Sequence, residues 1–180
     1  VGLGCGGPAA DDDDGSGGVR PTIVVSTDLL GDVVELLVGD EAEVLVAMPG
    51  GADPHTFEPS AGLLNEMLDA DAVVINGADL EVGLAETLAL AEDEGVPILH
   101  AIDHVTTLAA DDDHTHGPDE HEDGTDAATD PAHSHGDVDP HFFSDPARMV
   151  DAAEGLLDAL AEEVPSLSSE AARSAADQGL

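Results

Sequence analysis

Two short phrases of the sequence place a histidine on a stiff loop. Residues 53–57 read Asp-Pro-His-Thr-Phe and residues 139–143 read Asp-Pro-His-Phe-Phe, and all three phenylalanines of the chain lie in these phrases. Proline fixes its own φ and favours an extended conformation in the residue before it, so each imidazole is presented with little conformational entropy left to lose. Neutral imidazoles bind zinc and its first-row neighbours. His55 and His141 are therefore candidate ligands of one metal site.

Each phrase also supplies a carboxylate beside its histidine. Asp53 and Asp139 each stand two residues before the histidine of their phrase. A carboxylate next to a metal-binding imidazole commonly accepts the second ring N–H and so fixes its tautomer and orientation. The alternative is that each Asp-Pro step only makes a turn or starts a helix. The matched pair of phrases favours the metal site over this alternative.

Short apolar runs alternate with helical patterns along the chain. We expect strands at residues 22–26, 42–48, 72–75 and 96–99, and helices at residues 29–38, 63–68, 82–91 and 147–163. Asp145 followed by Pro146 favours the start of the last helix, and Pro165 ends it. This alternation predicts an α/β fold, with a parallel sheet flanked by helices. Ligands of such folds bind at the carboxyl ends of the strands, where we expect both phrases to lie.

The composition divides the chain into segments. We expect residues 1–20 to form a disordered acidic and glycine-rich tether, and residues 21–164 to form one α/β lobe. Within the lobe, residues 109–137 lack apolar periodicity and form an exposed insertion. The insertion carries five histidines that could collect zinc in preference to manganese: His114, His116, His121, His133 and His135. Their affinity would fall as imidazoles are protonated below about pH 6. The alternative is an acidic linker without a metal role.

The charge balance excludes several classes of partner. The chain has 41 acidic and 3 basic side chains, a formal net charge of -38. Such a surface repels nucleic acid and anionic lipid. The acidic residues are interspersed with apolar ones, which make up 42% of the chain, so we predict a folded protein with a halophile-like acidic surface. Salt would screen its self-repulsion.

The single cysteine has an informative position. Cys5 follows small residues and precedes an acidic, glycine-rich run, a pattern that resembles the start of a mature lipoprotein. We therefore expect a lipid anchor on Cys5, the alternative being a lone reduced thiol. No apolar stretch of about 18 residues is present, so any membrane attachment is expected to use this anchor alone.

Three motifs together resemble a known family. Residues 51–60 read Gly-Ala-Asp-Pro-His-Thr-Phe-Glu-Pro-Ser, residues 76–81 read Asn-Gly-Ala-Asp-Leu-Glu, and residues 139–146 read Asp-Pro-His-Phe-Phe-Ser-Asp-Pro. With the histidine-rich insertion before the last motif, their order and spacing resemble the zinc and manganese solute-binding proteins of ABC importers. The resemblance covers residues 22–180.

The resemblance implies a fold and a metal site. It implies two α/β lobes joined by a long rigid helix, with the metal between the lobes, and it makes His55 and His141 the imidazole ligands from the N-terminal lobe. Family members draw further ligands from the C-terminal lobe, and no histidine follows His141 here. We therefore expect this sequence to be the N-terminal lobe, with residues 165–180 starting the linking helix.

The resemblance also implies the function. It implies an extracytoplasmic, lipid-tethered and monomeric protein that captures zinc, or alternatively manganese, and delivers it to an ABC permease without catalysing a reaction. One rival hypothesis is a zinc hydrolase in which Glu58 or Glu81 serves as base. Another is a surface zinc buffer that acts through the insertion. We expect both glutamates to be surface carboxylates, and His100 and His104 to be ordinary loop histidines.

Overall fold

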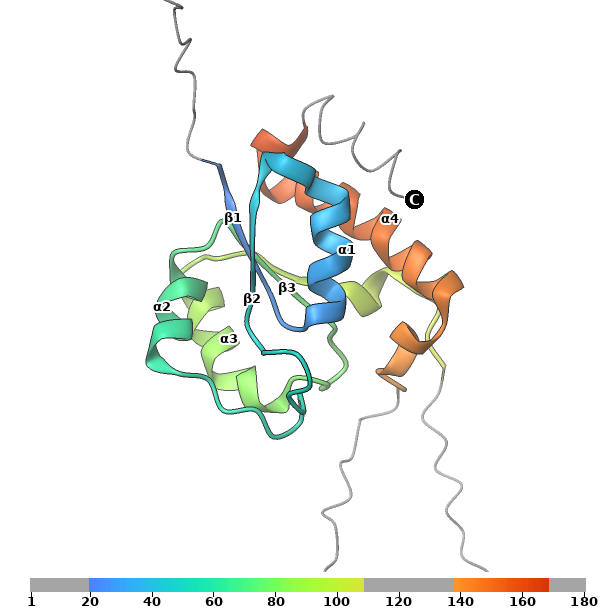
Figure 1. Ribbon diagram of the computed structural model, residues 1–180, viewed down its shortest axis with the longest axis horizontal. Coiled ribbons are helices and arrows are strands. Elements are labelled where there is room, and N and C mark those ends of the chain that lie inside the picture. The colour runs from blue at the N-terminus through green and yellow to red at the C-terminus, as the bar shows by residue number, and fades with distance from the viewer. Residues whose placement is uncertain (1–19, 109–137, 169–180) are drawn as a thin grey trace, which may run out of the picture.

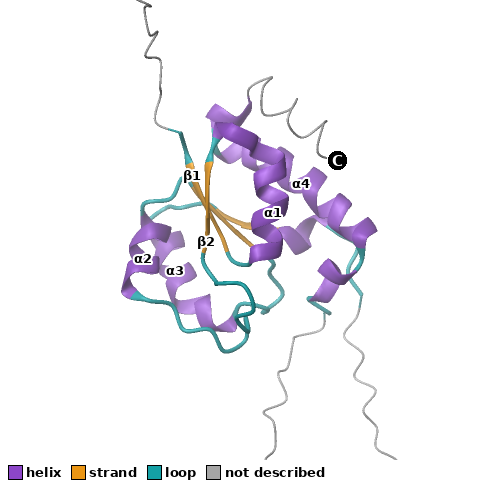
Figure 2. Ribbon diagram, viewed as in Figure 1, coloured by secondary structure: helices purple, strands orange, loops and turns teal. Residues whose placement is uncertain are grey.

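A computed structural model describes residues 20–108 and 138–168. Cys5, the five histidines of the insertion and the predicted helix beyond residue 168 lie outside these ranges. Four parallel strands are flanked by helices (Figures 1 and 2). The strands are β1 (Thr22–Val25), β2 (Glu43–Val46), β3 (Ala72–Ile75) and β4 (Ile98–His100). The helices are α1 (Asp28–Val38), α2 (Ala61–Leu68), α3 (Ala85–Asp93) and α4 (Pro146–Glu163). The predicted α/β architecture is confirmed.

The sheet reverses its winding direction in the middle. Its strand order is β2-β1-β3-β4, with all neighbours parallel. Helices α1 and α4 cover one face, and α2 and α3 cover the other (Figures 1 and 2). The loops that leave β1 and β3 therefore diverge to opposite faces, which opens a crevice at the carboxyl ends of these neighbouring strands.

Alternating side chains of the two central strands build two hydrophobic cores. Ile23 and Val25 of β1 pack with the apolar sides of α1 and α4, in what we call the α1/α4 core. Val24 faces the other way and packs with Val73 and Ile75 under α2 and α3, in the α2/α3 core. Every residue of β3 is buried, as its uninterrupted apolar run predicts for a central parallel strand. These cores hold the carboxyl edge of the sheet in place.

Polar side chains start three of the helices. Thr27 and Ser60 each accept a hydrogen bond from the backbone N–H three residues ahead, at 3.3 and 3.2 Å, and begin α1 and α2. Asp145 accepts the N–H of Ala147 at 3.0 Å, with Pro146 in the first helical position, so the predicted start of α4 is confirmed. In the described parts of the chain no helix is long and apolar enough to cross a membrane.

Most element boundaries differ from the sequence-based expectation by one to three residues, and those of α3 and β4 are among them. Residues 82–84 form a short 3-10 helix, so α3 begins later than predicted. Strand β4 begins at Ile98, because Pro97 has no N–H to donate to the ladder, and it continues through His100, which pairs with Ile75.

The prediction that His100 and His104 are loop histidines is wrong. His100 ends β4, and His104 lies in a 3-10 helix formed by residues 101–104. His104 is packed against α4 so closely that a Cβ on Gly155 would lie 2.3 Å from its Cγ. His104 is therefore a packing residue beneath α4.

Candidate metal centre

The loop between β2 and α2 carries the first histidine of interest. Asp53 Oδ1 accepts the backbone N–H of His55 at 3.0 Å, and the Asp53 carbonyl accepts the N–H of Thr56 at 3.2 Å. Asp53 thus closes a tight turn with its own side chain, as aspartate commonly does. His55 is half-buried, and Phe57 packs against the α2/α3 core. The first phrase is therefore seated on one face of the sheet.

The second phrase begins with the same turn and adds a ring contact. Asp139 Oδ1 accepts the backbone N–H of His141 at 2.9 Å and lies 2.7 Å from its ring Nδ1. A proton on Nδ1 satisfies this contact, which leaves Nε2 as the ring nitrogen able to bind a metal. Phe142 is 2% exposed in the α1/α4 core. The second phrase is therefore seated on the opposite face of the sheet.

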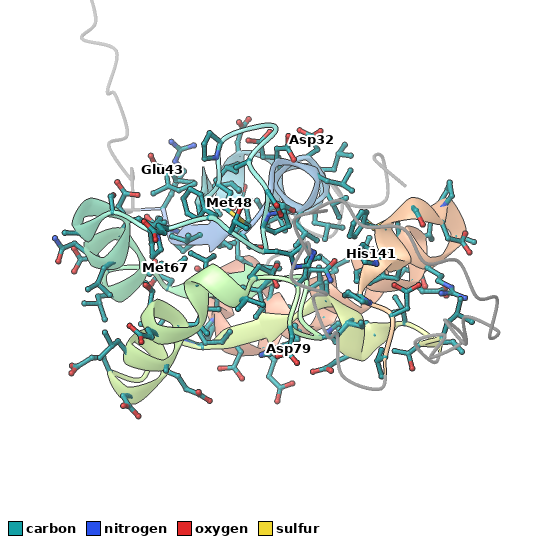
Figure 3. All side chains as sticks on the ribbon, turned by 90° about the horizontal axis from the view of Figure 1, so that it is seen from below. Asp32, Glu43, Met48, Met67, Asp79 and His141 are labelled. Atoms are coloured by element: carbon teal, nitrogen blue, oxygen red, sulfur yellow. The ribbon has the colours of Figure 1, made fainter. Side chains whose placement is uncertain are left out.

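The fold brings the two imidazoles together. The ring centroids of His55 and His141 are 6.3 Å apart, with 67° between the ring planes. Zinc binds imidazole nitrogen at roughly 2.1 Å, so a single ion can reach both rings after a small adjustment of the side chains. The ring of Phe143 packs edge-on against His141 at 5.7 Å and forms an apolar wall beside it. Figure 3 views this edge of the sheet, with His141 labelled.

Glu81 is buried, so the prediction that it is a surface carboxylate is wrong. It is 4% exposed. Its Oε1 accepts hydrogen bonds from Ser26 Oγ at 2.6 Å and from the Asn76 N–H at 2.7 Å, and its Oε2 accepts the Gly77 N–H at 3.2 Å. Three donors offset the cost of burying the carboxylate. Glu58, in contrast, is exposed as expected.

Asn76 is a site residue to which sequence reasoning gave no role of its own. It directly follows β3, is 2% exposed, and donates from Nδ2 to the Pro140 carbonyl at 2.9 Å. The end of β3 is thereby joined to the second phrase, immediately before His141. The sequence signal that could have identified Asn76 is its position as a polar residue directly after a continuous apolar strand.

Two cavities border this edge of the sheet. The larger, of about 300 Å³, is lined by Glu81 and His100 with residues of α3, and neither metal candidate lines it. The smaller, of about 220 Å³, is lined by Pro54, Asn76 and Phe143 next to the start of α1. We locate the candidate centre by the contact between the rings of His55 and His141, and not by the larger cavity. A bound metal ion requires donor atoms that converge on one point, and it does not require a large cavity.

At this centre the described residues supply two imidazoles and no larger ligand cluster. Within residues 20–108 and 138–168, no group of three or more His, Cys, Asp or Glu side chains is arranged to hold a metal ion. A structural zinc site usually has four ligands, and a catalytic zinc site usually has three protein ligands and a water or substrate. The arrangement can therefore provide one part of a coordination sphere.

Comparison with known proteins identifies relatives over most of the chain. Residues 23–178 match the family model for ZnuA, the periplasmic component A of a zinc-uptake complex. The zinc-binding lipoprotein AdcA of Streptococcus pneumoniae is 26% identical over 133 residues, which cover 72% of this chain and 24% of AdcA. The manganese-binding lipoprotein MntA of Halalkalibacterium halodurans is 33% identical over 96 residues, which cover 53% of this chain and 31% of MntA. The chain thus spans about a quarter to a third of the length of these relatives.

A solved structure shows the same fold. The crystal structure of Zn(II)-bound AdcA from Streptococcus pneumoniae matches with a TM-score of 0.67 at 21% identity, over 88% of this chain and 29% of that one. At 21% sequence identity, this likeness shows a shared fold and no more.

Proposed function

Because the chain belongs to the ZnuA family of periplasmic zinc-uptake components, we propose that it captures zinc outside the cytoplasm for an ABC importer. The family resemblance noted in the sequence is thereby confirmed. The observation that carries the proposal is the approach of His55 and His141 to a ring separation of 6.3 Å at the carboxyl edge of the sheet.

The proposed mechanism is capture rather than catalysis. Two neutral imidazoles on stiff loops bind the ion, and Asp139 keeps the Nε2 of His141 available by holding its Nδ1. His55 and His141 would be the two ligands of an N-terminal lobe, and a C-terminal lobe would supply the remaining ligands. Closure of two lobes excludes water around the ion, and docking on the permease reopens them.

The donor atoms favour zinc as the cargo. Imidazole suits zinc and its borderline neighbours, whereas manganese prefers oxygen ligands. Relatives are named for zinc in AdcA and for manganese in MntA. Manganese is therefore the alternative cargo, and the oxygen donors that complete the site would decide between the two ions.

Further parts of the proposal concern the assembly of the protein, its attachment to the membrane and its auxiliary residues. The protein would act as a monomer, tethered to the outer face of the cytoplasmic membrane through lipid on Cys5. The histidines of residues 109–137 would collect zinc beside the principal site, and residues 165–180 would lead into the linking helix. Asp53 would accept a ring N–H of His55 in the metal-bound protein.

The hydrolase alternative has little support. The carboxylate of Glu81 accepts three hydrogen bonds within the protein, so it is not poised to take a proton from a metal-bound water. The relatives compared above are named as metal-binding proteins.

Zinc calorimetry on His55→Ala and His141→Ala in the full-length protein tests the proposal. We expect either change to abolish tight binding of one ion, because each removes one of two converging donors. His100→Ala is the matched control, since it removes an exposed histidine at the same edge of the sheet. Deletion of residues 109–137 should remove only weaker binding. Unchanged tight binding in the double His55/His141 variant would overturn the assignment, and loss of all binding on the deletion would favour the zinc buffer.

A further inference from the structure

The segment of residues 76–83, which we call the 76–83 turn and which ends inside the 3-10 helix of residues 82–84, follows β3 with an unusual backbone. Gly77, Ala78 and Asp79 all have positive φ, at 86°, 50° and 56°. The left-handed region is disfavoured for residues that carry a Cβ, so Ala78 and Asp79 hold this conformation only because their surroundings impose it. Asp79 is labelled in Figure 3, at the same edge of the sheet as His141. The backbone of the turn therefore requires a stabilising partner.

The buried carboxylate of Glu81 is that partner. The backbone N–H groups of Asn76 and Gly77 both donate to this carboxylate, and consecutive N–H groups that converge in this way bind anions. Glu81 supplies this anion from within the same turn. Its bond to Ser26 Oγ then ties the turn to the end of β1. The 76–83 turn is thus fixed to both central strands.

The 76–83 turn holds the second phrase through a side chain. Asn76 Nδ2 donates to the Pro140 carbonyl at 2.9 Å and to the Gly77 carbonyl at 3.2 Å. The peptide unit that contains the Pro140 carbonyl also contains the His141 N–H. The position of Asn76 therefore sets the position of the backbone that carries His141.

The same turn holds the first phrase through backbone packing. A Cβ placed on Gly83 would lie 1.8 Å from the Phe57 carbonyl oxygen and 2.9 Å from its carbon. Only glycine allows this approach, since real side-chain carbons do not come so close to a backbone oxygen. Phe57 lies two residues after His55 in the same loop. The 76–83 turn therefore contacts both phrases at once.

We propose that the 76–83 turn sets the separation of His55 and His141, with Glu81 as its positioning residue. The inference rests on the proposed function for its effect on zinc. Glu81 touches no imidazole and acts through the backbone that it orders. A change in the turn should therefore alter zinc affinity while every imidazole is retained.

Three variants in the full-length protein test this inference. Glu81→Gln replaces one accepting oxygen with a donor, Asn76→Ala removes the bond to the second phrase, and Ser26→Ala removes the bond to β1. We expect zinc affinity, measured by chelator competition, to fall about 10-fold to 100-fold in the first two and less in the third, as for other residues that orient ligands. We also expect Glu81→Gln and Asn76→Ala to weaken the nuclear Overhauser contact between the rings of His55 and His141 in the metal-free protein.

Two matched controls distinguish an effect on the placement of the two histidines from a general loss of protein stability. Thr87→Val removes another buried polar group, in α3, and Glu92→Gln neutralises an exposed carboxylate that lines the same cavity as Glu81. Both should leave the zinc affinity and the ring contact unchanged. If Asn76→Ala and Glu81→Gln lose thermal stability as Thr87→Val does but keep both readouts, the turn has no positioning role.

The outcome also distinguishes this inference from the proposed function. Normal zinc binding by the His55→Ala and His141→Ala variants would overturn both. Loss of binding in those variants, with wild-type affinity in Asn76→Ala, would overturn only the positioning role. If Glu81→Gln does not fold, Asn76→Ala decides alone, because it leaves the backbone bonds to Glu81 intact.

Discussion

The two Asp-Pro-His phrases have almost the same sequence but are held by different forces. In both, the aspartate accepts the backbone N–H of the histidine, at 3.0 Å in the first phrase and 2.9 Å in the second. The first phrase is then held by close packing of its backbone against Gly83. The second is held by hydrogen bonds, from Asn76 to Pro140 and between Asp139 and the imidazole. A repeated motif thus fixes the local turn, and its placement depends on tertiary contacts of two different kinds, both made by the 76–83 turn.

We expect the largest effect from a change that breaks the packing of the first phrase. Gly83→Ala forces a Cβ onto the Phe57 carbonyl, and backbone on both sides leaves no flexible side chain to yield. The free energy of unfolding should fall by about 1–3 kcal/mol, as for other overpacked sites, and zinc affinity should fall with it. Urea denaturation and zinc titration measure the two effects.

Gly62→Ala provides the control for the packing prediction. Gly62 lies in α2, where the nearest atom to an added Cβ is Ser60 Oγ at 3.5 Å, an ordinary contact. Alanine should raise stability there by at most about 1 kcal/mol. If Gly83→Ala, like Gly62→Ala, does not lower the free energy of unfolding, the first phrase is not held by packing against Gly83.

We expect an effect of intermediate size when Asp53 and Asp139 are replaced, and the effect should differ between the two residues. Asp139→Ala removes the partner of a ring nitrogen, so zinc affinity should fall by about 10-fold to 100-fold. Asp53→Ala removes a bond to the backbone of His55 and should cost about 1 kcal/mol of stability. Its loss of affinity should be smaller, because the ring contact of Asp139 is already formed at 2.7 Å, whereas the one proposed for Asp53 forms on metal binding. Zinc titrations of both variants under the same conditions measure the difference. Equal losses of affinity would show that the two aspartates act alike on their rings.

The smallest effect should come from a bond at the edge of the second phrase. Ser144 Oγ donates to the His141 carbonyl at 2.9 Å, but the residue is exposed and water can replace the hydroxyl. Ser144→Ala should change stability by no more than about 0.5 kcal/mol and leave zinc affinity unchanged. A loss of affinity as large as that of Asp139→Ala would mean that the second phrase depends on its whole local network.

Much of the fold follows from local sequence signals. The continuous apolar run of β3 and the Asp145-Pro146 helix start can be recognised in the sequence. A strand that is buried on both faces and a helix cap each depend on only a few consecutive residues. The candidate metal centre is harder to predict from the sequence. Glu81 is buried in a turn with three left-handed residues, where two backbone N–H groups and Ser26 Oγ donate to its carboxylate, and no periodicity encodes that turn. The contact between Asn76 and Pro140 likewise joins residues far apart in the chain.

The packing of Phe57 and Phe142 links the candidate centre to the unfolding behaviour of the protein. Phe57 belongs with the α2/α3 core and Phe142 with the α1/α4 core, and the sheet separates these two hydrophobic layers. An ion bound by the adjacent histidines would tie the layers together at one edge. Bound metal favours the states in which both layers are formed, so partial opening of either layer should become rarer. Occupancy of the site would then appear in hydrogen exchange as slower opening of amides on both sides of the sheet, including amides distant from the ion.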